Sequence, residues 1–218
     1  MSNFFSPDSK FVKFGNRITD LLLLQLATLL CCLPIFTIGA AVTAMHHVLL
    51  KLYRMEEPYV FQTYFRAFKK NFKQATLMWL IYLGAILFLL ADLYMVLHTE
   101  HEALYMSFYL LIVPALLVAF SLSWSFVLLS RYDNGIWLTI RNSFIMTMRY
   151  PVKAITMLVL LFMPLAAMIF FDAAIPFAIL YGFSGPGYIR TLLYSQVFDE
   201  LEDSNWRQKL VEQTMDKD

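Results

Sequence analysis

The stretch Ala75–Leu97 reads ATLMWLIYLGAILFLLADLYMVL, and Asp92 is its one charged residue. A second stretch, Leu104–Leu129, contains no charged residue. A helix needs about 20 predominantly apolar residues to cross a hydrocarbon core roughly 30 Å thick, so each stretch is long enough to span a membrane. Only the short segment His98–Glu102 separates them. We therefore predict two membrane-spanning helices joined by a tight turn.

The composition extends this interpretation to the whole chain. Of the 218 residues, 60% are hydrophobic and 15% are charged, whereas soluble domains have about 45–50% apolar and about 25% charged residues. The 20 Phe, 12 Tyr and 4 Trp residues suit lipid-facing surfaces and interfacial belts. We predict an all-α, polytopic transmembrane helical bundle. The formal net charge of +1 gives no indication of a nucleic-acid partner.

The positions of the Lys and Arg residues predict how the chain is threaded. All 17 lie outside the stretches Ile18–Leu50, Gln74–Ser130 and Ala154–Ile189. Because Lys and Arg in short loops stay on the cytoplasmic side, the basic segments are predicted to be internal. The segment His98–Glu102 has carboxylates but no Lys or Arg, so we predict that it is external. Both termini are then cytoplasmic.

Two of these stretches are too long for one span and too short for two complete ones. Ile18–Leu50 and Ala154–Ile189 hold about 33 and about 36 residues, and a helix of that length measures roughly 50 Å. Cytoplasmic flanks require an even number of crossings in each. The predicted membrane segments are 18–36, 38–53, 75–97, 104–129, 154–171 and 174–194. The alternative is five segments, with one of the two stretches forming a single tilted or kinked helix. Residues 1–201 are predicted to form one membrane domain, and residues 202–218 a cytoplasmic polar tail.

Residues 54–73 are predicted to form an amphipathic helix on the inner membrane surface. Aromatic residues alternate there with Arg66, Lys69, Lys70 and Lys73. This composition is typical of helices that lie on an anionic leaflet, and it also suits the docking of a partner protein. The four basic side chains are therefore candidate contacts to the membrane surface or to a partner.

A shift of the sequence by about eighty residues aligns several residues that are uncommon in membrane segments. The aligned pairs are Pro34 with Pro114, Lys73 with Lys153, Thr76 with Thr156, and Asp92 with Asp172. This pattern favours a parallel internal repeat, as in some transporters. The alternative is that any two units of a loop followed by a span begin with basic residues and end with polar ones.

Several short motifs together resemble one known family. They are Phe14–Arg17, the segment Cys32–Ala41 with the sequence CLPIFTIGAA, Leu52–Glu57, Phe65–Thr76 and Val197–Glu200. In this order they resemble the YesL family of bacterial integral membrane proteins, over most of the chain. The resemblance implies a domain of unknown function in the bacterial plasma membrane. It also implies a gene neighbourhood of carbohydrate-uptake transporters, glycoside hydrolases and sensor–regulator pairs, and it brings no catalytic residue.

Three residues in or beside the apolar segments are candidates for an intramembrane polar site: Asp92, Asp172 and His46. A carboxylate is costly at the bilayer centre and much less so near the interface, so its depth decides its role. In one interpretation the aspartates reach external water, and in the other they face one cavity as cation or proton sites. His46 and His47 point about 100° apart on a helix, so we expect one of them to line the bundle and bond to a neighbouring helix.

Two further features of the apolar segments concern helix breaks and hydroxyl groups. Pro34 with Gly39, and the segment 182–187 with its Gly and Pro residues, interrupt apolar regions. Interrupted helices often form binding sites in transporters. Ser121, Ser123 and Ser125 alternate along the chain, so they cannot share one helical face. We expect them to bond to backbone carbonyl groups or to neighbouring helices.

The sequence predicts neither catalysis nor a cofactor. It contains no nucleophile elbow, phosphate-binding loop, dinucleotide-binding glycine pattern or zinc-protease helix. His98 and His101 lack the spacing of a zinc site, and we expect Cys31 and Cys32 to be small buried apolar residues.

We therefore expect a membrane protein that is not an enzyme and holds no metal. The first hypothesis is an accessory or regulatory subunit that binds a transporter or a sensor within the bilayer and is linked to carbohydrate uptake. The alternative is a small transporter or channel that acts as a homo-oligomer. A third hypothesis is a protein that interacts with lipids or assists membrane insertion, because the segment 54–73 has a membrane-active composition.

Overall fold

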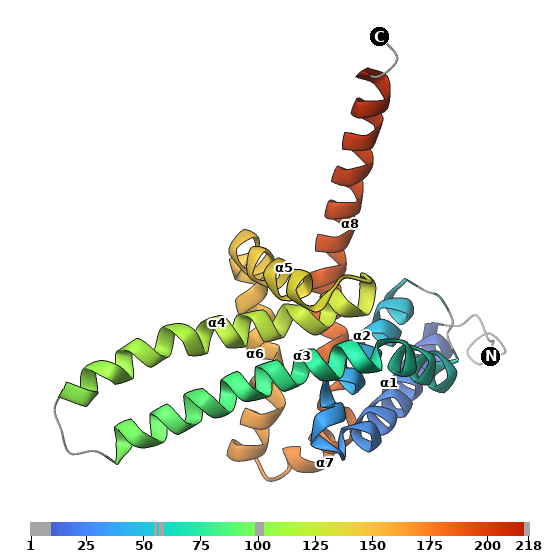
Figure 1. Ribbon diagram of the computed structural model, residues 1–218. Coiled ribbons are helices and arrows are strands. Elements are labelled where there is room, and N and C mark those ends of the chain that lie inside the picture. Colours follow the sequence, from blue (N-terminus) through green and yellow to red (C-terminus); the bar gives the residue numbers. More distant parts are fainter. Residues whose placement is uncertain (1–9, 55, 57–58, 99–102, 216–218) are drawn as a thin grey trace.

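The computed structural model describes residues 10–54, 56, 59–98 and 103–215, and this part of the chain is all-α, as predicted. It contains no strand within these ranges. The elements are α1 (Lys10–Cys32), the 3-10 turn η1 (Ile35–Thr37), α2 (Ile38–Tyr53), α3 (Val60–Leu97), α4 (Ala103–Arg131), α5 (Ile136–Arg149), α6 (Pro151–Phe170), α7 (Ala174–Tyr181) and α8 (Ser184–Met215) (Figure 1).

The chain reverses direction between successive long helices, so that basic segments gather on one side of the bundle. In Figure 1 the start of α3 and the helix α5 lie in the upper and right-hand part of the molecule. The C-terminal end of α3 and the turn from α6 to α7 lie toward the left and the bottom. α1 and α2 form a helical hairpin in the first long apolar stretch, and the break falls where Pro34 caps the 3-10 turn.

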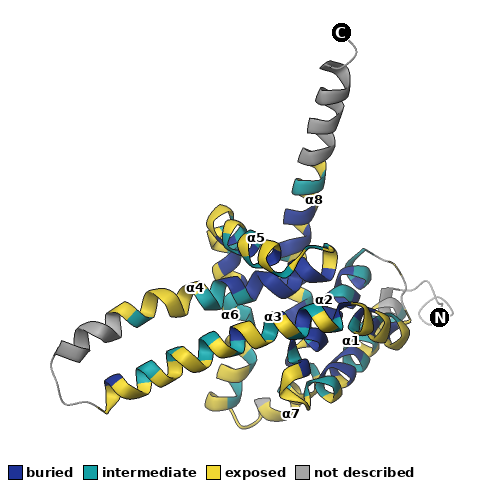
Figure 2. Ribbon diagram, in the orientation of Figure 1, coloured by how far each residue is buried: buried dark blue, intermediate teal, exposed yellow. Residues whose placement is uncertain are grey.

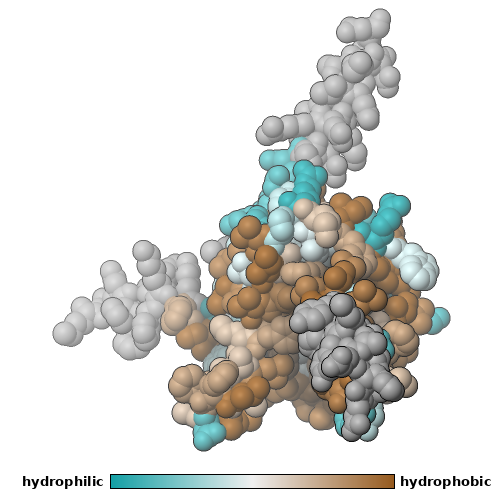
Figure 3. All heavy atoms as spheres, turned by 90° about the vertical axis from the view of Figure 1, so that its left-hand side faces the viewer, coloured by the Kyte–Doolittle hydropathy of each residue, from teal (hydrophilic) through white to brown (hydrophobic). Residues whose placement is uncertain are grey.

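Within the described residues, four segments are long and apolar enough to cross a membrane: Ile35–Tyr53, Val60–Leu97, Leu110–Arg131 and Pro151–Phe170. The outer half of α3 and residues 110–117 of α4 are mostly exposed (Figure 2). The face of the molecule seen in Figure 3 is largely hydrophobic, and hydrophilic atoms gather mostly in its upper part. A soluble monomer rarely exposes apolar surface on this scale, whereas helices that face lipid do. The first predicted segment is formed by α1, and the last by α7 with the start of α8. Compared with the four long apolar segments, α1 and α8 carry more charged residues and α7 is shorter.

Residues 60–73 do not form the separate interfacial helix that was predicted at 54–73. They are the first third of α3, which runs unbroken for 38 residues, about 57 Å of helix. No Pro or Gly interrupts the sequence between Val60 and Tyr82, so nothing ends the helix where basic residues give way to apolar ones. The buried positions follow one continuous face at spacings of three and four residues: Tyr64, Ala67, Asn71, Ala75, Met78 and Tyr82.

The basic segment between α4 and α6 contains a helix, α5, that the sequence did not lead us to expect. Its buried face is polar, with Thr139, Ser143 and Thr147 turned inward. Its exposed face includes Trp137 and Met148, which are 78% and 69% exposed. A helix that turns Trp, Met and Arg outward beside apolar spans has the composition of an interfacial helix.

The C-terminal helix also departs from the prediction. α8 begins at Ser184 and continues to Met215, so the predicted polar tail at 202–218 begins inside a helix. The predicted segment 174–194 is divided into α7 and α8 at residues 182 and 183. The backbone N–H groups of Phe183 and Ser184 donate to Oε1 of Gln25 at 3.0 and 2.8 Å, so a side chain of α1 satisfies two donors at the start of α8.

Glycine residues allow close contacts on two sides of α2. A Cβ atom at Gly39 would lie 2.5 Å from the carbonyl oxygen of Ala75 and 2.6 Å from Cβ of Trp79, both on α3. A Cβ atom at Gly187 of α8 would lie 2.9 Å from Cδ1 of Leu49. Small residues at such contacts let membrane helices approach closely, where packing and hydrogen bonds replace the hydrophobic effect.

The proposed repeat stays a prediction. Under a shift of about eighty residues, the connection before α3 falls near the connection before α5. The helix breaks fall at different places, because the break between α1 and α2 falls near Pro114, inside the continuous helix α4. In the same shifted alignment, the unbroken helix α3 corresponds to two helices, α5 and α6, which are separated at Tyr150.

Candidate ligand site inside the bundle

A cavity of about 530 Å³, open to the outside of the bundle, lies between α2, α3, α4, α6 and the junction of α7 with α8; Leu90, Phe162 and Leu165 in its wall are more than half exposed. Its walls are mostly aliphatic and aromatic side chains, among them Val42, Trp79, Leu122, Phe126, Leu158 and Phe183. Its volume falls within the roughly 300–1,000 Å³ of typical ligand pockets. Apart from the indole of Trp79, its polar side chains among the described residues are His46, Ser123 and Arg190.

Arg190 is the charged residue of this cavity, and it is only 5% exposed. Its Nη2 donates to the carbonyl oxygen of Ser123 at 3.0 Å and lies 3.4 Å from the Oγ of the same residue. Its Nε is buried and has no hydrogen-bond partner among the described residues. No ion pair with a carboxylate is formed by Arg190 within the described part of the chain. A buried guanidinium without a counter-ion is energetically costly, which makes this residue a candidate for ligand binding.

From the sequence, Arg190 was counted with the basic residues that flank the apolar stretches, although the predicted membrane segment 174–194 contains it; the structure buries it within α8. The positive-inside rule assigns a lone Arg after an apolar run to a loop. The signal that indicated otherwise is the apolar sequence that continues beyond it, because Tyr194, Val197 and Phe198 are fully buried on the same helix. Gly187, one turn before Arg190, brings this part of α8 close to α2.

His46 is fully buried and lines the same cavity. Its Nδ1 lies 3.4 Å from the hydroxyl of Tyr194, which in turn lies 2.9 Å from Oγ1 of Thr191. Its Nε2 is buried and has no hydrogen-bond partner in the part of the chain that the structure describes. His47 points elsewhere, with Nδ1 3.0 Å from the carbonyl oxygen of Ser130, in agreement with the angle of about 100° between successive helical residues.

The other two candidate residues of the predicted intramembrane site do not join His46. Asp92 lies half-buried near the outer end of α3, and Asp172 is exposed in the turn between α6 and α7. Neither aspartate lines the cavity. The idea of a shared cation or proton site therefore has no geometric basis in the described residues, because each aspartate lies near a helix end rather than inside the bundle.

The hydroxyl groups of α4 serve both sides of that helix, as their alternation predicts. The hydroxyl of Tyr82 lies 2.5 Å from Oγ of Ser121 and 2.6 Å from Oγ of Ser125. Ser121 also lies 2.7 Å from Oγ of Ser143 on α5. Ser123 lies on the opposite side and contacts Arg190. The network joins α3, α4 and α5 and satisfies the hydroxyls of Tyr82, Ser121, Ser125 and Ser143, so it has a structural role.

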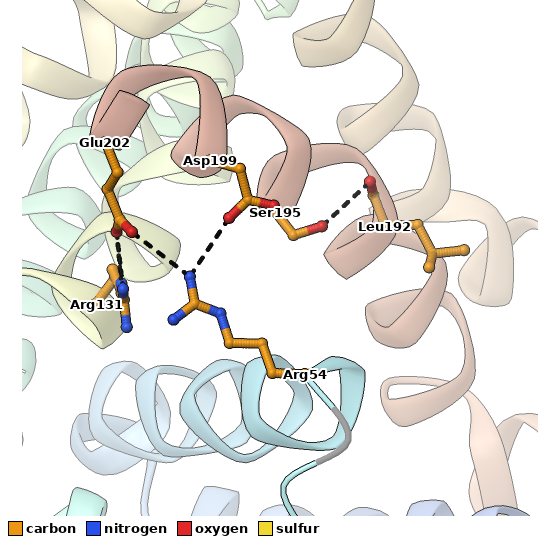
Figure 4. Close-up of polar contacts among 6 residues, drawn as sticks. All are labelled: Arg54, Arg131, Leu192, Ser195, Asp199 and Glu202. Carbon is orange, nitrogen blue, oxygen red and sulfur yellow. Dashed lines mark hydrogen bonds and ion pairs between the residues drawn. The ribbon is translucent and has the colours of Figure 1, made fainter. Parts of the chain in front are cut away.

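Ion pairs hold α8 against the ends of α2 and α4. Arg54 lies 3.5 Å from Asp199 and 3.8 Å from Glu202, and Arg131 lies 2.8 Å from Glu202 (Figure 4). The side chains are 27–59% exposed, so each pair contributes little in water, on the order of 0–1 kcal/mol. Their charges indicate that this end of the bundle lies in an aqueous or interfacial environment.

The predicted basic contact residues separate into two pairs. Arg66 and Lys70 line a polar cleft of about 230 Å³ beside the connection from α4 to α5. Nζ of Lys70 lies 2.8 Å from a carboxylate oxygen of Asp133. Lys69 and Lys73 are exposed and do not line the cleft.

Within the described residues, no group of three or more His, Cys, Asp or Glu side chains is placed to hold a metal ion. His101 and its neighbouring glutamates lie outside the described residues.

Residues 18–93, from α1 through most of α3, match the model of a family of proteins of unknown function, DUF624. No curated protein and no solved structure matches the chain. The match includes His46 and the walls contributed by α2 and α3, whereas Ser123 and Arg190 lie beyond it.

Proposed function

We propose that this chain is an integral membrane protein that is not an enzyme and that acts as an accessory or regulatory subunit of a membrane assembly linked to carbohydrate uptake. The resemblance to the YesL family supports the link to carbohydrate uptake and a location in the bacterial plasma membrane. The family match by itself is to proteins of unknown function. The apolar helices support a position in the bilayer.

The observation that favours an accessory role over a sugar carrier is the apolar lining of the cavity. A sugar presents many hydroxyl groups, and each one that leaves water without a new hydrogen bond costs about 1–3 kcal/mol. Three polar side chains cannot replace the water around such a substrate. The sugar would then cross through a partner, and this chain would support or regulate that partner.

Co-purification tests this proposal. The full-length tagged chain would be cross-linked in cells that express it at its natural level, extracted in a mild detergent and purified. We expect the membrane subunits of one uptake system to be recovered in a constant ratio, and a reciprocal purification through such a subunit to recover this chain. Repeated recovery of the chain alone, together with unchanged sugar uptake in cells that lack it, would reject the proposal.

The chain offers a matched pair of variants for this experiment. Lys69→Glu/Lys73→Glu reverses two exposed charges of α3, and Arg66→Glu/Lys70→Glu reverses two charges of the polar cleft on the same helix. A partner that docks on the exposed face should be lost only in the first variant. A partner that docks through the cleft should be lost only in the second.

The second candidate function is a small oligomeric transporter or channel, and the internal cavity with its buried cation favours it. Flux through proteoliposomes that contain only this chain is the discriminating measurement. Transport that survives in Asp92→Asn/Asp172→Asn would agree with the exclusion of both aspartates from the cavity. Loss of transport in the Arg190→Gln variant would indicate that the transported substrate passes through the cavity.

A further inference from the structure

Among the described residues, His46 and Arg190 of the cavity wall each have a buried polar atom without a partner, and the chemistry of these two atoms is complementary. Nε of Arg190 is a hydrogen-bond donor in every protonation state that occurs in proteins. The role of Nε2 of His46 follows from its neighbours. Oγ1 of Thr191 donates its hydrogen to the carbonyl oxygen of Gly187 at 2.9 Å, so the hydroxyl of Tyr194 donates to Thr191 and accepts from Nδ1 of His46. The ring proton is then on Nδ1, and Nε2 is an acceptor.

The rest of the cavity is apolar and large. Its walls from α3, α4 and α6 include Leu89, Leu90, Leu161 and Leu165, which have no polar atoms in their side chains. A molecule that fills the space therefore needs a hydrocarbon body, and a polar group at one end that both accepts and donates a hydrogen bond. The positive charge of Arg190 favours a group that can also become an anion.

We propose that the cavity binds a long-chain carboxylic acid, with its carboxyl group between Arg190 and His46 and its hydrocarbon chain along the leucines of α3, α4 and α6. One carboxyl oxygen accepts a hydrogen bond from the guanidinium. The other shares the acid proton with Nε2 of His46, so the proton stays in the site and the complex gains no net charge. The two unpartnered atoms are shielded from the cavity in the structure, so the side chains of Arg190 and His46 turn them toward the carboxyl group when it binds.

The depth of Arg190 favours a free acid over a bilayer phospholipid. Nine residues further along α8, Asp199 belongs to the ion pairs at the charged end of the bundle, which is about 14 Å along the helix. The headgroup of a phospholipid would have to leave the interface by about that distance to reach the guanidinium. Its phosphodiester also has no hydrogen to offer to Nε2 of His46. A single-chain acid enters the hydrocarbon core in its neutral form, because burial favours the uncharged state.

Quenching of tryptophan fluorescence tests the proposal directly, because Trp79 lines the cavity. Purified full-length protein, freed of lipid in a maltoside detergent, would be titrated with dibromostearic acid, with its methyl ester and with a brominated phosphatidylglycerol. We expect saturable quenching by the acid, and binding of the ester and of the phospholipid that is at least about tenfold weaker. Equal affinity of acid and ester would overturn the proposal, and tighter binding of phosphatidylglycerol would assign the site to a membrane lipid instead.

Two variants locate the binding. Arg190→Gln should weaken binding of the acid at least about tenfold while leaving the weak binding of the ester unchanged. Leu122→Trp fills the apolar part of the cavity and keeps Arg190, so it should block both ligands. If Arg190→Gln does not fold, the comparison of acid with ester on the unaltered protein still decides. Undiminished binding of the acid to a folded Arg190→Gln variant would contradict the assignment.

Discussion

Substitution of Gly39 by alanine should destabilise the protein, because α2 and α3 are in close contact at this glycine. The new Cβ would lie 2.5 Å from a carbonyl oxygen, about 0.9 Å nearer than ordinary contact at 3.4 Å, and 2.6 Å from Cβ of Trp79. Both neighbours are close to the backbone of α3 and cannot rotate away. The helices would have to separate, which also displaces a residue that lines the cavity.

The expected magnitude follows from two opposing contributions. Overpacking of a well-packed site costs about 1–3 kcal/mol, and a rigid backbone neighbour favours the upper value. Alanine in place of glycine in a helix stabilises the folded state by about 0.5–1 kcal/mol. The net loss of about 2 kcal/mol corresponds to a fall of roughly 4–8 °C in Tm for a chain of this length.

Gly84 provides the matched control. It also lies in a helix, but nothing approaches within 4 Å of a Cβ placed there. Gly84→Ala should therefore gain the helical contribution alone and raise Tm by about 1–4 °C. Thermal unfolding followed by size-exclusion chromatography in detergent measures both variants. A Gly39→Ala protein as stable as Gly84→Ala would refute the close contact between α2 and α3.

Three further predictions concern other contacts. Tyr82→Phe removes a hydroxyl that contacts two serines, including Ser121, and should cost about 1–3 kcal/mol of the free energy of unfolding; a change within error would show that the network is not stabilising. Glu202→Gln removes an exposed partner of two arginines and should cost less than about 1 kcal/mol, with a smaller effect still in high salt. Spin labels at the exposed positions Lys73 and Leu87 should give one narrow distance distribution, since their backbones are separated by about 21 Å of continuous helix. A broad or bimodal distribution would mean that α3 bends or breaks.

The two spans in α3 and α4, and the turn between them, could be predicted from the sequence because the length of an apolar run indicates a membrane helix without any periodic pattern. Apolar runs of sufficient length predict helices by themselves, and α3 and α4 end and begin on either side of the predicted turn, at Leu97 and Ala103. The break at Pro34 was visible because proline leaves few backbone conformations. The helix α2 accordingly has the bounds that were predicted, Ile38–Tyr53.

The failures have a common physical cause, which is that polarity was used as a guide to depth. Arg190 was counted with the basic residues that flank the apolar stretches because it is charged, and α5 was not anticipated because its inward residues, such as Ser143, are hydroxylated. Inside a membrane bundle, polar side chains can be the buried ones, because lipid is as apolar as leucine. A single sequence does not show whether a side chain such as that of Arg190 donates its hydrogen bonds to a buried residue, here Ser123, or to water. His46 could be expected to face inward, but its neighbours come from α8 and lie 148 positions away.

The capping of α8 by Gln25 has a consequence for the order in which the protein is assembled in the cell. The first and last helices of the described chain meet there, so the start of α8 gains its hydrogen bonds only from a helix that was synthesised much earlier. α8 is not among the segments apolar enough to enter a bilayer unaided. It should therefore dock late, onto helices already inserted, and only then does Arg190 complete the cavity. A ribosome that stalls before Ser184 would leave the apolar spans in the membrane with an open groove in place of the finished pocket.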